Sequence, residues 1–207
     1  MFITIKENIS SEIVEKKSRF IANIYKVESR EEAELKIKEV KKKYFDARHN
    51  CSSYRVIEDG KIIEKANDDG EPSGTAGAPM LNILQKNNLC NILVIVTRYF
   101  GGILLGTGGL VRAYSDATIK AIEEAEKVKY EEGVEYQVKV DYSELENLKY
   151  YCKKNDINII KTEYLNEIIC NLEVQNEIIE KFLSDIEKRN INIVEVKEIS
   201  KKYVAVN

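Results

Sequence analysis

Residues 91–114 read NILVIVTRYFGGILLGTGGLVRAY, and the rest of the chain is organised around this stretch. It opens with an almost continuous apolar run of the kind that a buried central strand shows. Five of the chain's ten glycines then fall within the nine positions 101–109. A helix with one broad apolar face is predicted over 110–127. Flexible backbone concentrated between a strand and a helix indicates a functional site at this loop.

The elements before this stretch are predicted by periodicity and turn chemistry. Strands are expected over 2–9 and 19–27, and a helix follows because Ser29 and Glu32 have the spacing of a capping box. Residues 51–65 predict a hairpin with a tight turn at Asp59 and Gly60. The polar stretch 67–79 predicts an ordered loop, and a short helix is expected to begin at Met80.

The second half predicts strand, helix, two strands, helix and strand, which is the order of the ferredoxin-like split motif. Ser143 and Glu146 predict a capping box at its first helix. The natural boundary lies at 130–133, so we expect an α+β protein with one domain over 1–130 and a second over 134–207. The basic and acidic residues number 21 and 19 up to Tyr130, a balance of +2, and 11 and 16 after it, a balance of −5.

Composition restricts the class of protein. The chain has 207 residues, of which 43% are apolar and 32% charged, as is ordinary for a globular protein. It contains no run of 18 apolar residues and no secretory signal pattern, so a cytoplasmic location and no membrane partner are expected. The net charge of −3 does not indicate a dedicated DNA-binding protein, so any contact with nucleic acid must come from local patches.

The glycine loop is a candidate anion site, because bare backbone amides at a helix N-terminus can hold a phosphate. Neither nucleotide motif is met: Gly108 stands where a phosphate loop needs lysine, and Val111 stands where a dinucleotide fingerprint needs glycine or alanine. A structural glycine turn packed against 67–79 is the alternative. The candidate anion or nucleic-acid surface comprises Arg98, Gly101, Gly102, Gly106, Gly108, Gly109 and Arg112. Glycine adopts positive φ at little cost, so Gly102 and Gly108 are expected to be required by the backbone.

Other chemistry is weaker in the sequence. Acidic side chains at 68, 69 and 71 could hold magnesium, but turn chemistry requires the same residue types. His49 is the only histidine, and a nucleophilic pair with Cys51 lacks an orienting third residue. The four cysteines have no metal-binding spacing and are expected to be buried thiols. No metal and no cofactor are expected, and no catalytic residue is assigned.

Three stretches, 47–56 (ARHNCSSYRV), 68–81 (DDGEPSGTAGAPML) and 91–114, resemble the signature of the IMPACT/YigZ family. The resemblance covers most of 1–127, and the second half is similar to the smaller C-terminal domain of bacterial members. Leu104 stands where many members have lysine, which removes a charge from the loop. The family-motif positions are His49, Asp69, Gly70, Glu71, Pro72, Ser73, Gly74, Thr75 and Gly77.

The resemblance implies that the N-terminal domain has the fold of the second domain of ribosomal protein S-five and that the C-terminal domain is ferredoxin-like. Both domains resemble the distal domains of translation elongation factor G, and eukaryotic relatives regulate translation. The leading expectation is therefore a translation-associated regulator that contacts RNA or the ribosome without catalysis. A module that binds a protein partner is the first alternative, and a hydrolase using Asp69, Glu71 and His49 is the second. The oligomeric state is left open.

Overall fold

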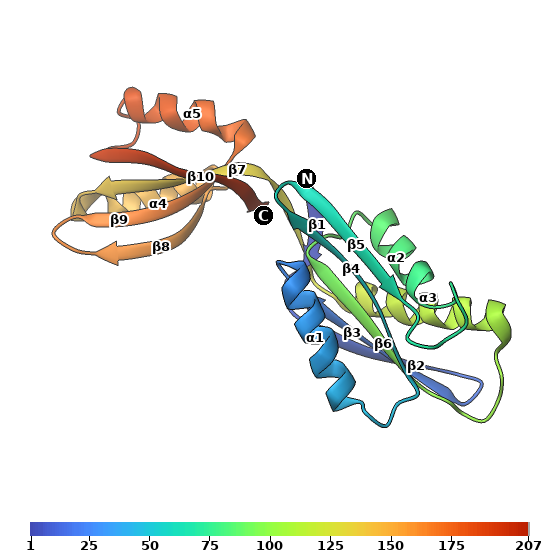
Figure 1. Ribbon diagram of the computed structural model, residues 1–207. Helices are drawn as coiled ribbons and strands as arrows, with labels where there is room; N and C mark the ends of the chain where they lie inside the picture. The colour runs from blue at the N-terminus through green and yellow to red at the C-terminus, as the bar shows by residue number, and fades with distance from the viewer. Residues whose placement is uncertain (207) are drawn as a thin grey trace. The chain divides into compact units, whose positions relative to one another are not determined.

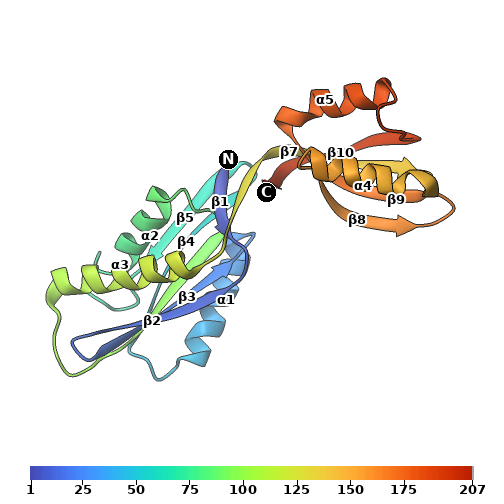
Figure 2. The same ribbon diagram turned by 180° about the vertical axis from the view of Figure 1, so that it is seen from behind.

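The computed structural model describes residues 1–206, and the chain divides into two compact α/β units between Lys127 and Val128 (Figure 1; Figure 2). The first unit begins at Phe2 and the second contains the rest of the chain after Lys127. The expected junction at 130–133 lies inside strand β7 (Lys127–Val140) rather than in a loop. Each unit is described by itself below.

The first unit is built on an antiparallel sheet of order β2–β3–β6–β4–β5. The helices lie on its two faces, α1 on one side and α2 with α3 on the other (Figure 1). The strands of this unit are β1 (Phe2–Ile5), which is not part of that sheet, β2 (Ile9–Glu15), β3 (Ser18–Lys26), β4 (His49–Glu58), β5 (Lys61–Asn67) and β6 (Ile92–Tyr99). Its helices are α1 (Arg30–Lys43), α2 (Gly77–Lys86) and α3 (Gly106–Glu124).

Strand β6 is apolar throughout because both of its faces are covered. Ile92, Val94 and Val96 pack with residues of α2 and α3 in one cluster, whereas Leu93 and Ile95 pack under α1 in another. All five side chains are fully buried. The central strand predicted over the apolar run is therefore confirmed, and it ends where the glycine loop begins.

Two local predictions in the first unit are confirmed. The Ser29 hydroxyl accepts a hydrogen bond from the backbone amide of Glu32 at 3.1 Å and so caps α1. Asp59 and Gly60 have φ angles of 50° and 72°, the two positive values that a type I′ hairpin turn requires. Both features depend on residues within three positions of one another.

Strand β2 was not predicted, and the single strand expected over 2–9 is wrong. β1 ends at Ile5, and β2 forms a hairpin with β3 through Lys16 and Lys17, whose φ angles are 44° and 67°. Lysine rarely occupies this left-handed region, so the turn has none of the glycine or asparagine residues that mark such turns. The sheet pairing on β3 imposes the turn instead.

Helices α2 and α3 begin earlier than their sequence indicates. α2 begins at Gly77 rather than Met80, because the Asp68 carboxylate accepts hydrogen bonds from the amides of Gly74, Ala76 and Gly77 at 2.8–3.0 Å. α3 begins at Gly106 rather than at residue 110, with no side-chain cap. Its start is helical although glycine is a poor helix former.

In the second unit, β7 is followed by a 3-10 turn (Tyr142–Glu144), α4 (Leu145–Lys154), β8 (Asn158–Tyr164), β9 (Ile168–Gln175), α5 (Asn176–Glu187) and β10 (Glu195–Val206). The antiparallel pairs give the order β8–β9–β7–β10. A core from this unit alone packs α4 and α5 against the sheet, with Phe182 fully buried against Tyr136. The predicted element order is present.

The capping box predicted at Ser143 is wrong. Ser143 lies inside the 3-10 turn, α4 begins at Leu145, and the preceding residue Glu144 makes no side-chain cap hydrogen bond. Ser143 and Glu146 have the spacing of a capping box, but the 3-10 turn places Ser143 before the helix start. Its side chain therefore does not cap α4.

Candidate functional site

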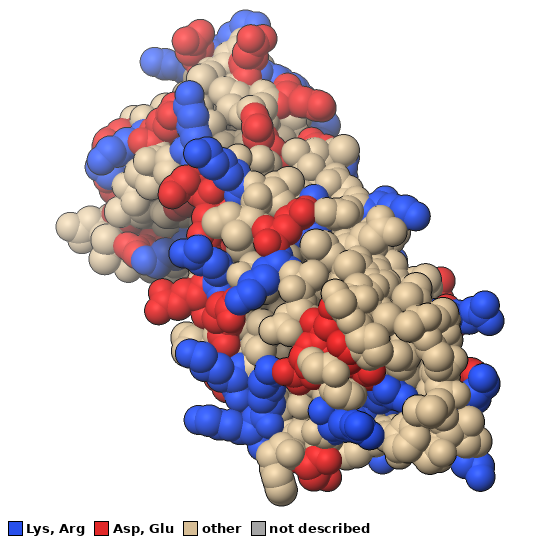
Figure 3. Space-filling view, turned by 45° about the vertical axis from the view of Figure 1, so that its right-hand side comes forward, with Lys and Arg blue, Asp and Glu red and all other residues tan. Residues whose placement is uncertain are grey.

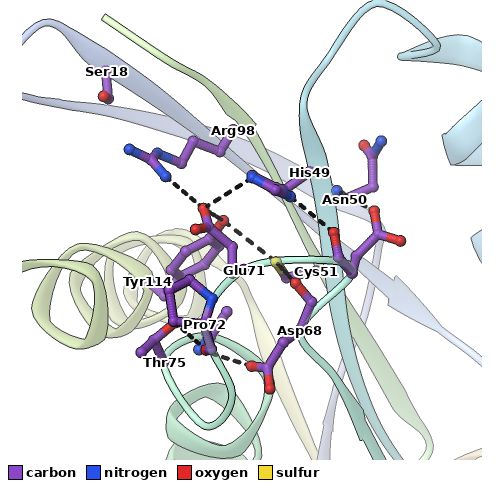
Figure 4. A network of polar contacts seen from close by, with 12 residues as sticks. Ser18, His49, Asn50, Cys51, Asp68, Glu71, Pro72, Thr75, Arg98 and Tyr114 are labelled. Atoms are coloured by element: carbon purple, nitrogen blue, oxygen red, sulfur yellow. Dashed lines mark hydrogen bonds and ion pairs between the residues drawn. The ribbon is translucent and has the colours of Figure 1, made fainter. Parts of the chain in front are cut away.

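A buried polar cluster lies at the end of the first unit's sheet where β4 begins and β6 ends. His49 and Arg98 are register partners on these two strands. The loop between β5 and α2 brings Glu71 over them, and α3 supplies Tyr114 from the far side (Figure 4). Residues that are 16 to 65 positions apart in the chain are thereby brought together.

One carboxylate oxygen of Glu71 is the centre of this cluster. It accepts a hydrogen bond from Arg98 Nη1 at 2.6 Å and one from the Tyr114 hydroxyl at 2.9 Å, and His49 Nε2 lies 3.8 Å away. The side chains of Glu71 and Arg98 are 3% and 7% exposed. Removing one partner of such a buried ion pair leaves an uncompensated charge, which typically costs about 3–5 kcal/mol.

The orientation of His49 is determined by a backbone contact. Its Nδ1 lies 2.8 Å from the carbonyl oxygen of Asp69. A carbonyl oxygen only accepts, so Nδ1 carries a hydrogen, and in a neutral ring the Nε2 lone pair then faces Glu71. This ring therefore attracts Glu71 only when it is protonated at Nε2.

The acidic residues of the 67–79 loop are used to hold the loop itself. Burial alone would raise the pKa of Asp68, but the hydrogen bonds from three backbone amides at the start of α2 outweigh it and lower that pKa. Asp69 binds Lys41 Nζ at 2.5 Å and accepts from the Asn50 amide at 2.7 Å. Within residues 1–206, no three His, Cys, Asp or Glu side chains converge to hold a metal ion.

Cys51 lies next to the polar cluster as a protonated thiol. Its Sγ donates to the Asp68 carbonyl at 2.9 Å and contacts the Tyr114 hydroxyl at 3.3 Å. Burial raises the pKa of Cys51 to about 12, and burial also raises the pKa of Tyr114. The geometry gives no support to a Cys51–His49 nucleophile, because the hydrogen-bond partners of Cys51 are Asp68 and Tyr114 rather than His49.

The glycines of the loop have different roles. A Cβ on Gly101 would lie 2.0 Å from the carbonyl carbon of Lys17, so this residue packs against the β2–β3 turn and not against 67–79 as expected. Gly102 and Gly106 have φ angles of 83° and 73°. Gly108 has no positive φ, and a Cβ there would meet no atom within 4 Å. The expectation that the backbone requires glycine at 108 is wrong.

The two loops do meet across a pocket of about 420 Å³, called here the α3 pocket. His49, Glu71 and Arg98 form its polar wall, Phe100, Leu104 and Leu110 form its apolar wall, and Gly106 and Thr107 of the first turn of α3 line it as well. Gly70 and Pro72 contribute from the opposite loop. The family-motif loop and the glycine loop therefore share one cavity.

The two arginines singled out from the sequence lie in different surroundings. Arg98 is buried between the rings of Phe20 and Phe100, whose centroids lie 5.5 and 5.6 Å from its guanidinium carbon. Arg112 is exposed on α3. Eight residues further along α3, Lys120 donates to the Glu12 carbonyl of β2.

Basic residues from four segments gather at this end of the first unit, and Figure 3 shows blue side chains in the lower part of the view. The β2–β3 turn packs on Gly101, Arg48 lies 5.9 Å from the Phe100 ring, and α1 ends at Lys43, shortly before Arg48 in the chain. None of these cations forms an ion pair within residues 1–206. We call the following set the basic end: Lys16, Lys17, Lys42, Lys43, Arg48 and Arg112.

Of these six residues, only Arg112 belongs to the surface predicted from the sequence. Lys16, Lys17 and Arg48 are scattered in the chain. Lys42 and Lys43 lie in the last turn of α1, where lysines also complement the helix dipole. The one indication in the sequence was the slight positive net charge of the first half, and a net charge does not show which basic residues lie close together in the fold.

None of the helices among the described residues combines the length and the apolarity needed to cross a membrane.

Comparisons with known proteins agree on one family. The family model described as the Impact N-terminal domain matches residues 16–122. The IMPACT family member YvyE of Bacillus subtilis is 50% identical over 121 residues, which cover 58% of this chain and 55% of that protein. The IMPACT family member YigZ of Escherichia coli is 31% identical over 187 residues, covering 88% and 92%. A crystal structure of a hypothetical protein is similar over 96% of this chain and 97% of that one, with 27% identity and a TM-score of 0.59.

Proposed function

Because the chain belongs to the IMPACT family, we propose that it is a cytoplasmic, translation-associated regulatory protein that contacts RNA or the ribosome and has no catalysis of its own. The resemblance of its sequence to regulators of translation supports the first part. The basic end supports the second part and is the observation that carries the proposal. A chain with a net charge of −3 presents six unpaired cations at one end of one unit.

Geometry favours phosphate at this end. The amides in the first turn of α3 have no side-chain cap, and the positive end of the helix dipole lies among the basic residues. Arg48 and Arg112 are exposed, so their guanidinium groups are available for the paired hydrogen bonds that phosphate accepts. Backbone contacts of this kind position a nucleic acid without reading its sequence.

The buried groups nearby support a binding role more than a catalytic one. The Cys51 thiol stays protonated near neutral pH, since its pKa is raised to about 12. The carboxylates of Asp68 and Asp69 are already engaged by backbone amides and Lys41. Glu71 is held by Arg98 and Tyr114.

The domain assignment is part of the proposal. We infer that residues 1–130 form a domain like the second domain of ribosomal protein S-five and that 134–207 form a ferredoxin-like domain. The antiparallel order β8–β9–β7–β10 with two helices packed on the sheet supports the second assignment.

Sedimentation with ribosomes and subunits at low and moderate salt tests this function. Arg112→Ala and Arg48→Ala should each weaken association and flatten the plot of log affinity against log salt by about 0.7–0.9, as expected for one lost phosphate contact. Arg30→Ala is the matched control, because Arg30 begins α1 at the opposite end of the unit from Lys43, about 20 Å away. Association without salt dependence, or equal losses in all three variants, would contradict the proposal.

Apolar side chains at the same end favour the protein-partner alternative. Phe45 and Leu104 are 84% and 82% exposed. A protein partner that covers them would bind with a weak salt dependence, so the same salt series separates the two functions. Replacement of Leu104 by serine would then weaken association more than Arg112→Ala does.

A further inference from the structure

The α3 pocket has the size and lining of a small-molecule site rather than of a packing defect. Its volume of about 420 Å³ falls within the range of about 300–1,000 Å³ that ligand pockets occupy. Such sites combine apolar walls with a few convergent polar groups. Here Phe100, Leu104 and Leu110 form the apolar part, and polar groups approach from β4, β6 and α3.

Arg98 retains hydrogen-bonding capacity that the protein does not use. Its side chain is more than nine-tenths buried and lines the pocket. Nη1 binds Glu71, but Nε is buried and has no hydrogen-bond partner within residues 1–206. A buried donor without an acceptor is uncommon in native proteins and calls for an explanation.

The first turn of α3 faces Arg98 across the same pocket. Gly106 and Thr107 line the cavity, and the helix has no N-terminal side-chain cap. Free amides, a helix dipole and a cationic donor thus meet in one cavity, and each of them favours an anion. Arg48, also on the pocket wall, adds a second positive charge against the single negative charge of Glu71.

The apolar wall indicates what the anion is attached to. Phe100 and Leu104 are 40% and 82% exposed at the rim. The Arg48 guanidinium lies 5.9 Å from the Phe100 ring. An aromatic ring beside a guanidinium plane is the arrangement on which nucleic-acid bases stack.

From these features we propose that the α3 pocket binds a terminal phosphate group carried on a flat, largely apolar body, the chemistry of a nucleoside 5′-monophosphate. The phosphate lies between the first turn of α3 and Arg98, and the base lies on Phe100. Two sources present this group: a free mononucleotide and the 5′-phosphorylated end of an RNA strand.

Thr107 offers a sharp test, because it lies in the first turn of α3 and lines the pocket. Thr107→Asp places a negative charge where the phosphate binds, yet an acidic residue in the first turn favours the helix itself. Thr107→Asn has nearly the same shape without the charge and is the matched control. Arg98→Ala is a poor test, since it would leave Glu71 buried without its cation.

Calorimetric titration of the full chain with adenosine 5′-monophosphate, adenosine and inorganic phosphate measures the predicted specificity. The monophosphate should bind at least tenfold more tightly than adenosine, and inorganic phosphate should compete with it. Thr107→Asp should lose tenfold or more in affinity without a lower melting temperature, whereas Thr107→Asn should lose less than threefold. Equal binding of adenosine and the monophosphate, or unchanged affinity in Thr107→Asp, would overturn the proposal.

Two oligonucleotides of one sequence, with and without a 5′-phosphate, identify the source. A tenfold preference for the phosphorylated strand assigns an RNA end, and equal binding of both strands, alongside tight binding of the monophosphate, assigns a free nucleotide. Failure here is distinct from failure of the proposed function. Ribosome association that depends on Arg112 but persists in Thr107→Asp would support the basic end alone, and monophosphate binding without ribosome association would support the pocket alone.

Discussion

At the scale of single residues, Glu71 is the position on which the polar cluster depends. Its one oxygen serves Arg98 and Tyr114 at hydrogen-bond distance, with His49 close by. All of these groups are largely removed from water, so the charge of Arg98 has no alternative partner within the described chain. The loop that carries Glu71 is held independently by Asp68 and Asp69.

Replacement of Glu71 should therefore be costly in a graded way. Glu71→Ala should lower the free energy of unfolding by about 3–5 kcal/mol, because it leaves the Arg98 charge buried and unpaired. Glu71→Gln keeps an acceptor oxygen for Arg98 and Tyr114 and should lose less, about 1–3 kcal/mol. Urea unfolding followed by circular dichroism measures both. A loss below about 1 kcal/mol for the alanine variant would show that water reaches this ion pair.

At the scale of elements, the segment from β6 through the glycine loop into α3 joins the core to the pocket. Gly101 is needed for a close approach to the β2–β3 turn, whereas Gly102 and Gly106 are needed for their positive φ angles. Gly108 is needed for neither reason. The glycines of this loop thus have two different physical explanations, and Gly108 has neither of them.

Two alanine substitutions separate these explanations. Gly101→Ala should destabilise the protein by about 1–3 kcal/mol, since its Cβ would collide with the Lys17 backbone and the turn must move. Gly108→Ala should be neutral or stabilise α3 by up to about 1 kcal/mol, because alanine is the better helix former and has room. Thermal melts of the two variants beside the wild type give the comparison. Similar melting temperatures for both variants would refute the close approach at Gly101.

At the scale of the whole molecule, the chain builds separate cores on either side of Lys127. The cores of the first unit use residues between Ile3 and Ala125, and the core of the second uses residues between Val134 and Val196. Strand β7 begins at Lys127, before the junction expected at 130–133. A fragment that contains only the second unit must therefore begin at or before Lys127 to keep β7 whole.

A fragment of residues 127–207 should unfold in one cooperative transition. It retains β7 in full and every residue of its own hydrophobic core. A fragment that starts at residue 134 removes the first half of β7, where residues 129–133 pair with β10, and should melt at a lower temperature. Calorimetry of the two fragments tests this. A broad, non-cooperative melt of 127–207 would mean that the second unit needs the first.

Several features of this protein follow from neighbouring residues alone. The Ser29 cap, the Asp59–Gly60 turn, the buried strand β6 and the element order of the second unit were predictable, because each depends on propensity or periodicity within a few positions. The capping box predicted at Ser143 from residue spacing alone was wrong, because spacing does not determine at which residue the helix begins. The glycine loop stands out in the sequence, but its contact with Lys17 depends on a residue more than 80 positions away.

The sequence by itself determined which segments form strands, turns and helices, because those choices depend on interactions over a few residues. Only the tertiary structure decided where α2 and α3 begin, which glycines are indispensable and where charges meet. Arg98 and Glu71 are 27 positions apart, and Tyr114 and Glu71 are 43 apart. Such contacts form only when β4 pairs with β6 and α3 packs across the two strands. The pocket and the basic end likewise depend on segments that are far apart in the sequence.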